Sequence, residues 1–250
     1  MTDKPIALVT GAGRRRVGQA VARHLAQQGY ALAIHYRTAR QEAEQFCHEC
    51  QLGGIPATAF AADLADLGQT ERLAKAVFDH FGRIDVLVHC ASRWQACALE
   101  HLTAEAIVGD WNIHAGSALL LGKHVGLAMT RQAQGGCIVF LGDWAIVRPY
   151  RDYPSYLASK GAIPTITRLL AVELGTRHPK VRVNAILPGP VLPPEEMTQE
   201  QIHQLEKSTL VGRVGSADEV AQAVVFFLTN AFLTGVCLPL DGGRTIYAGA

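Results

Sequence analysis

A tyrosine and a lysine four residues apart, Tyr156 and Lys160, are the residues of this sequence best suited to acid–base chemistry. On a helix, side chains four positions apart lie on one face, one turn from each other. A free phenol has a pKa of about 10 and is a poor acid–base catalyst at neutral pH. A nearby ammonium favours the phenolate, so we expect Lys160 to lower the pKa of Tyr156 towards the working range. Such pairs also occur by chance on surface helices, so the assignment needs a cofactor site and a second polar group against Tyr156.

A glycine-rich turn lies far upstream, between a short apolar run and a region of helical periodicity. Glycines let the backbone approach a pyrophosphate, and the N-terminus of the following helix supplies N–H groups and a positive dipole. The turn lacks the central glycine of many such sites and contains three arginines instead. At the first strand–helix junction it predicts a dinucleotide site, formed by Gly11, Arg14, Arg15, Arg16, Val17 and Gly18.

The end of the second expected strand, His35-Tyr36-Arg37-Thr38, decides between NAD and NADP and is assigned to cofactor binding. NAD sites place a carboxylate here to bind the ribose hydroxyls, whereas this stretch has no acid before Glu42. A 2′-phosphate carries nearly two negative charges and favours arginine. Arg37 and Thr38, with one or more arginines of the glycine turn, are expected to surround that phosphate, so the predicted cofactor is NADPH/NADP+. The alternative is a solvated basic loop.

The elements that must position these residues alternate between apolar strand-like runs and helical patterns. Strands are expected at 6–9, 31–36, 55–60, 86–90, 137–141, 181–187 and 236–240, and helices at 17–29, 38–51 with Thr38 as its N-cap, 67–81, 103–130, 155–174 and 218–230. Continuously apolar strands are typical of a parallel sheet covered on both faces. The pattern predicts one α/β domain over 1–250 with a single doubly wound, Rossmann-like sheet of about seven strands. Ligands bind such sheets at the carboxyl ends of the strands.

Composition excludes several other classes. The formal net charge is +1, which argues against nucleic-acid binding through a broad basic face. No apolar run is long enough to span a bilayer, and the residues before the first strand are too few for a signal peptide, so a cytoplasmic protein is expected. The six cysteines are scattered, and Cys47-His-Glu-Cys50 lacks a second ligand pair. Reduced core cysteines and no metal site are therefore expected.

The order of its motifs resembles the short-chain dehydrogenase/reductase family over almost the whole chain. The matching motifs are the turn at 10–18, Asp63-Leu64, His89-Cys90-Ala91-Ser92, Tyr156 with Lys160, Asn184 with Pro188-Gly189-Pro190, and Asp241-Gly242-Gly243. The resemblance implies that Tyr156 donates the proton, that Lys160 binds the nicotinamide ribose and lowers the pKa of Tyr156, and that Asp63 contacts the adenine. It also implies cofactor contacts from Leu64, Cys90, Ala91, Ser92, Pro188, Gly189 and Val191, the loop after Pro188-Gly189 holding the carboxamide.

One departure from the family concerns the partner of Tyr156. The family's usual serine thirteen residues before the tyrosine is Asp143 here. A serine hydroxyl can donate to a carbonyl oxygen that becomes an oxyanion, whereas an ionised aspartate cannot donate and repels that oxygen. Asp143 instead suits a substrate with N–H groups or a protonated C=N bond. The alternative is an ion pair of Asp143 with Arg148 or Arg151.

Trp94 is a second departure, just past the fourth expected strand. Its indole is expected to stack on a flat heterocycle against the nicotinamide, and the alternative is an aromatic that only closes the pocket wall. Together with Asp143 and the arginine-bearing turn, Trp94 resembles the pterin-reducing branch of the family, the pteridine and dihydromonapterin reductases. In that branch Asp143 and Tyr156 would supply the proton and Trp94 the stacking wall.

Two further departures are His114 and Cys90. His114 aligns with the family's asparagine on the long central helix, which binds a water behind the lysine, and we assign it to the catalytic group. A proton relay and a satisfied core histidine remain equal alternatives for its role. Cys90 replaces the asparagine of the family's Asn-Ala-Gly turn, with no role foreseen beyond packing.

These residues predict an NADPH-dependent reductase of a pterin-type ring imine, with dihydromonapterin, dihydrobiopterin or dihydrofolate as substrate. The enzymatic alternative is a general carbonyl or 3-oxoacyl-thioester reductase, and the non-enzymatic one is an NADPH-binding regulator. An irregular segment from Pro188 to about Thr198 indicates a substrate-loop insertion near 188–212 that acts as a lid, or an ordinary surface loop. The family implies a homotetramer assembled through the helices at 103–130 and 155–174. Tyr150 and Tyr153 are expected to line the substrate mouth.

Overall fold

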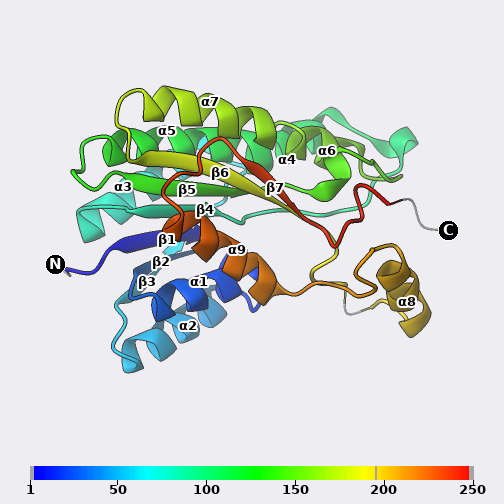
Figure 1. Cartoon of the computed structure of the whole chain (residues 1–250), viewed down its shortest axis with the longest axis horizontal. Helices are drawn as coiled ribbons and strands as arrows, with labels where there is room; N and C mark the ends of the chain where they lie inside the picture. The colour runs from blue at the N-terminus through cyan, green and yellow to red at the C-terminus, as the bar shows by residue number, and fades with distance from the viewer. Residues whose placement is uncertain (1–2, 195, 248–250) are drawn as a thin grey trace.

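The computed structural model describes residues 3–194 and 196–247, and its centre is one parallel sheet (Figure 1). The strand order is β3-β2-β1-β4-β5-β6-β7, and every pair of neighbours runs parallel. The strands are β1 Ile6–Thr10, β2 Ala31–Tyr36, β3 Ala57–Ala61, β4 Val86–His89, β5 Gly136–Leu141, β6 Val181–Pro188 and β7 Cys237–Leu240. The predicted α/β class and the seven-stranded Rossmann-like sheet are confirmed.

Helices cover both faces of this sheet (Figure 1). On one face, α1, α2 and α9 pack around buried residues such as Leu25 and Phe227. On the other face, α3, α5 and α7 pack around buried residues such as Leu121 and Leu170. The helices are α1 Val17–Gln27, α2 Arg40–Leu52, α3 Leu67–Phe81, α4 Ala104–Trp111, α5 Ser117–Met129, α6 Pro154–Lys160, α7 Ile163–Gly175, α8 Gln199–Lys207 and α9 Ala217–Thr229.

The strand order reverses direction at β1, because β2 and β4 lie on its two sides. In doubly wound sheets this switch point opens a crevice at the carboxyl ends of the strands. The first strand is entirely buried, as expected of a parallel sheet covered on both faces. The glycine turn, the end of β2 and the loop after β4 therefore meet at one edge of the molecule.

The helix predicted over 103–130 is a continuous helical run, but it changes its winding in the middle. A π-helical turn, Asn112–Gly116, joins α4 to α5, and it contains His114. Single π turns inside α-helices are rare and are frequent at functional sites. The helix predicted over 155–174 is also divided, into α6 and α7.

One local prediction is wrong. Thr38 does not cap the second helix, which begins at Arg40 with Ala39 at its N-cap and without a side-chain cap. The segment predicted to be irregular, from Pro188 to about Thr198, contains no helix among its described residues. It is followed by α8, which was not predicted and which stands apart from both helical layers (Figure 1). None of the residues of α8 is buried, so its sequence carries no hydrophobic pattern imposed by packing against a core.

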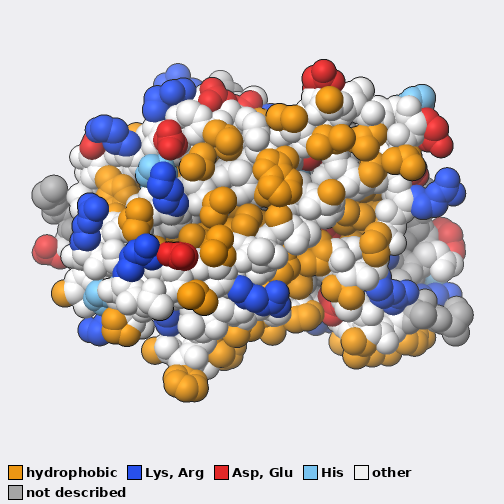
Figure 2. Space-filling model, turned by 90° about the horizontal axis from the view of Figure 1, so that it is seen from above, with side chains coloured by type: hydrophobic (Ala, Val, Ile, Leu, Met, Phe, Trp, Pro, Cys, Tyr) orange, Lys and Arg blue, Asp and Glu red, His pale blue; other side chains and the backbone are white. Residues whose placement is uncertain are grey.

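The outer face of α4, α5 and α7 remains apolar. Large hydrophobic side chains on these helices are between 40 and 65 % exposed: Ile107, Val108, Trp111, Leu119, Leu169 and Val172. Figure 2 shows hydrophobic side chains gathered in a band across this side of the molecule. Within the described ranges, no helix combines the length and hydropathy needed to cross a membrane.

Candidate active site

Three elements bring the four predicted catalytic residues together at the carboxyl end of the sheet. Tyr156 and Lys160 lie one turn apart on α6, Asp143 follows β5, and His114 comes from the π-helical turn. Their side chains form a connected group, since Tyr156 contacts both Asp143 and His114. The predicted grouping of these four residues agrees with this arrangement.

The Tyr156 hydroxyl donates a hydrogen bond to Asp143 Oδ2 at 2.6 Å. Asp143 Oδ1 accepts from the backbone N–H of Ala145 at 2.8 Å, which fixes the carboxylate plane. Burial, and then the charge of Asp143, raise the pKa of Tyr156 well above 10. The expectation that Lys160 lowers the pKa of Tyr156 is wrong here, because burial and the carboxylate dominate. The phenol therefore holds its proton at neutral pH.

The ion pair of Asp143 with Arg148 or Arg151 is absent from the described residues, so that alternative is wrong. Arg148 is already used, because its guanidinium donates to the carbonyl of Arg244 at 2.8 Å and to that of Tyr247. Arg151 is exposed. The Asp143 carboxylate is consequently free of a neutralising arginine and remains directed at Tyr156.

Lys160 is buried, and its ammonium donates to the carbonyl of Leu141 at 2.8 Å. Its Nζ lies 6.0 Å from the centre of the Tyr156 ring. Burial lowers the pKa of Lys160 to about 8, against the opposing charge of Asp143. The lysine is thus held at the end of β5 beside the tyrosine, as its spacing on the helix predicts.

His114 has a defined tautomer. The backbone N–H of Arg93 donates to Nε2 at 3.1 Å, so Nε2 carries no proton and Nδ1 carries it. Nδ1–H then donates to Ser159 Oγ at 2.8 Å, and the Ser159 hydroxyl donates to the Tyr156 carbonyl at 2.7 Å. Burial and the charge of Lys160 lower the pKa of His114 to about 2. The bonding describes a neutral positioning residue, and a proton relay through His114 stays a prediction.

A buried ion pair supports the same region and was not predicted. Arg93 donates to Asp110 Oδ1 from Nε at 3.0 Å and from Nη2 at 2.7 Å. The other carboxylate oxygen accepts from the Ser155 hydroxyl at 2.5 Å. Since Ser155 precedes Tyr156, this network fixes the start of α6 to α4 and to the loop after β4. Only the spatial neighbourhood reveals it, because the three residues are far apart in the sequence.

Aromatic side chains line the mouth of the site. Trp94 is 48 % exposed and stacks on Tyr153, with centroids 4.7 Å apart and planes at 13°. Its indole N–H donates to the Tyr150 hydroxyl at 2.9 Å. Tyr153 packs edge-on against both Tyr150 and Tyr156. One face of Trp94 is therefore covered by Tyr153, and stacking of a ligand on the indole stays a prediction.

A cavity of about 180 Å³ lies where the cofactor is expected. Gly11 adopts φ +65°, and a Cβ there would lie 2.8 Å from Ala91 Cα, so only glycine allows this close approach. The lining of the cavity comes from the glycine turn, the ends of β2, β3 and β4, and the π-helical turn: Gly11, His35, Arg37, Leu64, Ala91, Ser92, Arg93 and Ile113.

The arginines around this cavity are available for an anion. Arg14, Arg15, Arg16 and Arg37 are exposed. Arg14 lies 3.8 Å from Glu42 in a solvent-exposed pair, which is a weak interaction. The other three guanidinium groups have no carboxylate partner among the described residues. This donor set, together with the glycine cradle, fits a dinucleotide that carries an additional phosphate.

Of the remaining predicted cofactor residues, His35 braces the glycine turn, and the others lie at or after strand ends or at the start of α1. His35 is buried, and it accepts from the Gly11 N–H at Nδ1 and contacts the Ala62 carbonyl at Nε2, so it braces the turn. Tyr36 and Thr38 flank Arg37 at the end of β2, and Val17 and Gly18 begin α1. Asp63 and Cys90 are half-buried beside the cavity-lining Leu64 and Ala91, and Pro188, Gly189 and Val191 follow the end of β6.

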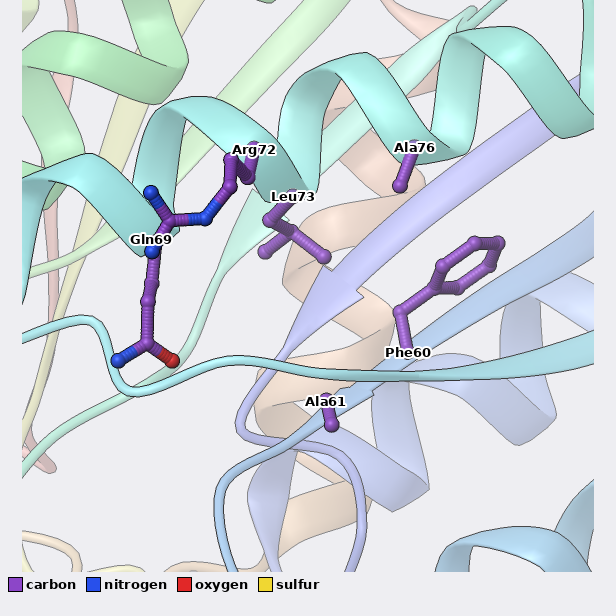
Figure 3. Close-up of a pocket in the computed structure, with 6 residues that line it drawn as sticks. All are labelled: Phe60, Ala61, Gln69, Arg72, Leu73 and Ala76. Atoms are coloured by element: carbon purple, nitrogen blue, oxygen red, sulfur yellow. The ribbon is translucent and has the colours of Figure 1, made fainter.

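A second hollow, of about 240 Å³, lies away from this edge, between α3 and β3 (Figure 3). Phe60 and Leu73 form its apolar side, and Gln69 and Arg72 its polar side. The Gln69 side chain is already bonded to the Asp63 N–H and to Asp66. None of the predicted site residues lines this hollow.

Comparison with known proteins places the chain among reductases. The family described as enoyl-(acyl carrier protein) reductase matches residues 11–245. The short-chain reductase protein NovJ of Streptomyces niveus is 32% identical over 98% of this chain and 95% of that protein. The human 3-oxoacyl-[acyl-carrier-protein] reductase is 33% identical over 92% of this chain and 94% of its own. Among solved structures, FolM alternative dihydrofolate reductase 1 from Brucella canis, complexed with NADP, has a TM-score of 0.89 at 30% identity, covering 98% of this chain and 96% of that one.

Proposed function

This chain belongs to the short-chain dehydrogenase/reductase family, and we propose that it is an NADPH-dependent reductase of a pterin-type ring C=N bond. Dihydromonapterin, dihydrobiopterin and dihydrofolate are the candidate substrates. The observation that carries the proposal is the hydrogen bond from Tyr156 to Asp143 at 2.6 Å. The solved Brucella canis protein, described as an alternative dihydrofolate reductase in complex with NADP, supports it.

The Asp143 carboxylate determines which bond can be reduced. A ketone oxygen gains negative charge as it is reduced, and a carboxylate beside it opposes that charge. A ring nitrogen gains a proton instead, and its N–H groups can donate to the carboxylate oxygens. Asp143 therefore favours a nitrogen heterocycle over a simple ketone.

NADPH, when bound, supplies the hydride that forms the new C–H bond at a ring carbon. The chain supplies the proton for the adjacent nitrogen, from the pair formed by Tyr156 and Asp143. Tyr156 retains this proton at neutral pH, because burial and the carboxylate of Asp143 raise the pKa of the phenol. Buried Lys160 places an ammonium 6.0 Å from the ring centre, and this charge stabilises the deprotonated phenol after transfer.

Binding of NADPH is assigned to the cavity at the switch point and its arginines. Arg37, with Arg14, Arg15 and Arg16, is proposed to hold the 2′-phosphate, Asp63 the adenine, and Lys160 the ribose. The loop from Pro188 through Val191 would hold the carboxamide. We further propose that residues 188–212, which include α8, form the insertion that closes the single domain over the substrate.

Reduction of a 3-oxoacyl thioester is the second candidate, because the human 3-oxoacyl-[acyl-carrier-protein] reductase is 33% identical to this chain. Asp143 argues against it, since the reacting group of that substrate is a ketone. Steady-state reduction of dihydrobiopterin and dihydromonapterin is compared with that of an acetoacetyl thioester. Activity confined to the thioester overturns the pterin proposal.

The variants Asp143→Asn and Tyr156→Phe test the proton donor. Loss of a positioned acid costs about 10²- to 10⁴-fold in rate, so we expect kcat for the dihydropterin to fall by that factor in both. Asp79→Asn, an exposed carboxylate on α3, is the matched control and should retain full activity. An unchanged kcat in Tyr156→Phe would contradict its role as proton donor. If the chain is an NADPH-binding regulator instead, Tyr156→Phe should leave every biological effect unchanged.

A further inference from the structure

Arg244 lies near the site and forms no ion pair with a carboxylate of the described residues. Its guanidinium carbon is 4.2 Å from the centre of the Trp144 ring, a cation–π contact that holds the group flat against the indole. The side chain is half-buried, and no carboxylate of the described residues pairs with it. A half-buried arginine with unused donors is available to an anion.

The turn that carries Arg244 is rigidly built. Asp241 accepts from the Gly243 N–H at 3.0 Å and from the Thr245 N–H at 2.6 Å. The two glycines between Asp241 and Arg244 have positive φ angles, which suit glycine. The Arg148 guanidinium donates a hydrogen bond to the Arg244 carbonyl at 2.8 Å. The backbone of Arg244 is therefore anchored on both sides, while its side chain keeps its donors.

Aromatic contacts connect Arg244 to the mouth of the site. Trp144 follows Asp143 directly, and its ring lies 6.2 Å from that of Tyr150. The Tyr150 hydroxyl accepts from the Trp94 indole. One wall of side chains therefore runs from the expected stacking position to a cation. It consists of Trp94, Tyr150, Trp144 and Arg244. Burial lowers the pKa of Arg244, and the nearby charge of Asp143 is among the effects that oppose this lowering.

We propose that Arg244 forms an anion subsite at the far end of this wall, which binds a carboxylate or phosphate on the tail of the pterin substrate. This inference rests on the proposed function and narrows its substrate class. A heterocycle at Trp94 would place its ring beside Asp143 and extend its side chain along Tyr150 and Trp144. The guanidinium fork matches a carboxylate or a phosphate in two parallel hydrogen bonds. Substrates with an anionic tail should therefore bind more tightly than neutral ones.

The test compares three substrates in the wild type and in Arg244→Gln. Dihydrofolate carries carboxylates on its tail, dihydromonapterin has a neutral tail, and dihydroneopterin monophosphate serves as the phosphate arm. We expect Arg244→Gln to raise KM for the anionic substrates by about tenfold or more, as loss of a charge-assisted bond predicts. KM for dihydromonapterin should stay within about twofold, and kcat should be unchanged for all three. The anionic substrate whose KM rises more identifies the preferred anionic group, carboxylate or phosphate.

Three controls separate the subsite from the reaction and from stability. Arg151→Gln removes an exposed cation of the loop between β5 and α6 and should change nothing, while Arg244→Lys should restore part of the affinity. Binding of folate and of neutral 6-hydroxymethylpterin, followed by tryptophan fluorescence, reads the subsite without catalysis. Equal losses for charged and neutral ligands, or no loss for either, overturn the subsite. If the wild type reduces no pterin, the proposed function fails, and the folate-binding comparison still decides the subsite.

Discussion

At the residue scale, the proposed chemistry depends on one side chain, because Asp143 stands where the family resemblance expects a serine hydroxyl. Asp143 accepts the Tyr156 hydroxyl and is not neutralised by Arg148 or Arg151. The pair therefore holds one proton between a phenol and a carboxylate, with a buried ammonium close by. Such a pair can protonate a nitrogen, but it offers an incoming ketone oxygen a negative charge.

The pH dependence should be governed by Lys160. Its pKa is lowered by burial from 10.5 to about 8, so the ammonium is present below pH 8 and is lost as the pH rises through that value. Since the charge is needed to bind the ribose and to stabilise the phenolate, kcat/KM should fall above about pH 8. Tyr156 cannot cause this fall, because its pKa lies well above 10.

A steady-state profile from pH 6 to about 10, with circular dichroism at each pH as the control for folding, checks this prediction. A kcat/KM that stays constant up to pH 9.5, about 1.5 pH units above the pKa of Lys160, would show that the charge of Lys160 is not required.

Cofactor choice should depend on Arg37 at the end of β2. The wild type is expected to prefer NADPH over NADH by at least about tenfold, because a charge-assisted bond to phosphate contributes about 1.5–3 kcal/mol. Arg37→Ala should raise KM for NADPH by about tenfold and leave KM for NADH unchanged. Arg40→Ala, which removes an exposed arginine already paired with Glu44, is the control. A wild-type preference for NADH would contradict the NADP assignment.

At the scale of elements, the site depends on how α4, the π-helical turn and α6 are held together. His114 connects the loop at Arg93 to Ser159, and Asp110 connects the same arginine to Ser155. Both connections end on residues next to, or bonded to, Tyr156. The loop after β4 and the helix that carries Tyr156 are therefore connected through two sets of hydrogen bonds.

The variant Asp110→Ala tests this connection. It leaves Arg93 and Ser155 without their buried acceptor, and we expect a loss of about 2–3 kcal/mol in the free energy of unfolding. Urea denaturation measures it, and kcat should fall in parallel because α6 loses its anchor. Asp79→Ala, in the exposed pair with Lys75, should cost less than about 0.5 kcal/mol. Equal small effects of both variants would show that the buried network is not structural.

The elements that are visible in the sequence are those whose pattern is imposed by the core. The strands, and helices such as α3, which matches its predicted range from Leu67 to Phe81, are recovered because buried faces fix their periodicity. The π-helical turn is invisible, because it changes the winding and not the composition. α8 has no buried face, and the signal that would have found it is the capping box of Thr198 and Gln201.

The residues of the candidate site also divide into those that the sequence identifies and those that only the structure reveals. Tyr156 and Lys160 are identified by their spacing on one helix, the glycine turn by its place after the first strand, and Asp143 by the family resemblance. The structure brings them to one edge. Arg93, Asp110 and Arg244 were not identified, because their roles depend on contacts between distant segments. The direction of the Tyr156 pKa was also wrong, because burial cannot be read from spacing.

At the scale of the whole molecule, the apolar outer face of α4, α5 and α7 is the surface on which the expected homotetramer would form. Side chains such as Trp111 and Val172 are at least half exposed on this face (Figure 2). Exposed apolar patches of this kind mark interaction surfaces. The family resemblance assigns the same helices to the contact between copies.

Light scattering tests this assembly. The wild type should have about four times the mass of the 26.9 kDa chain. The double variant Trp111→Glu with Val172→Glu should give a smaller species, because charges on a buried contact are not solvated. Leu52→Glu, at an exposed leucine on the opposite helical layer, should leave the mass unchanged. A monomeric wild type at micromolar concentration would contradict the tetramer.

The most direct measurement is a crystal structure with NADP+ and a bound dihydropterin, which shows what faces Asp143. We predict a ring or amino N–H of the ligand within about 3 Å of an Asp143 carboxylate oxygen, with the ring against Trp94. A bound carbonyl oxygen directed at Asp143, with no nitrogen near it, would contradict the preference for nitrogen heterocycles.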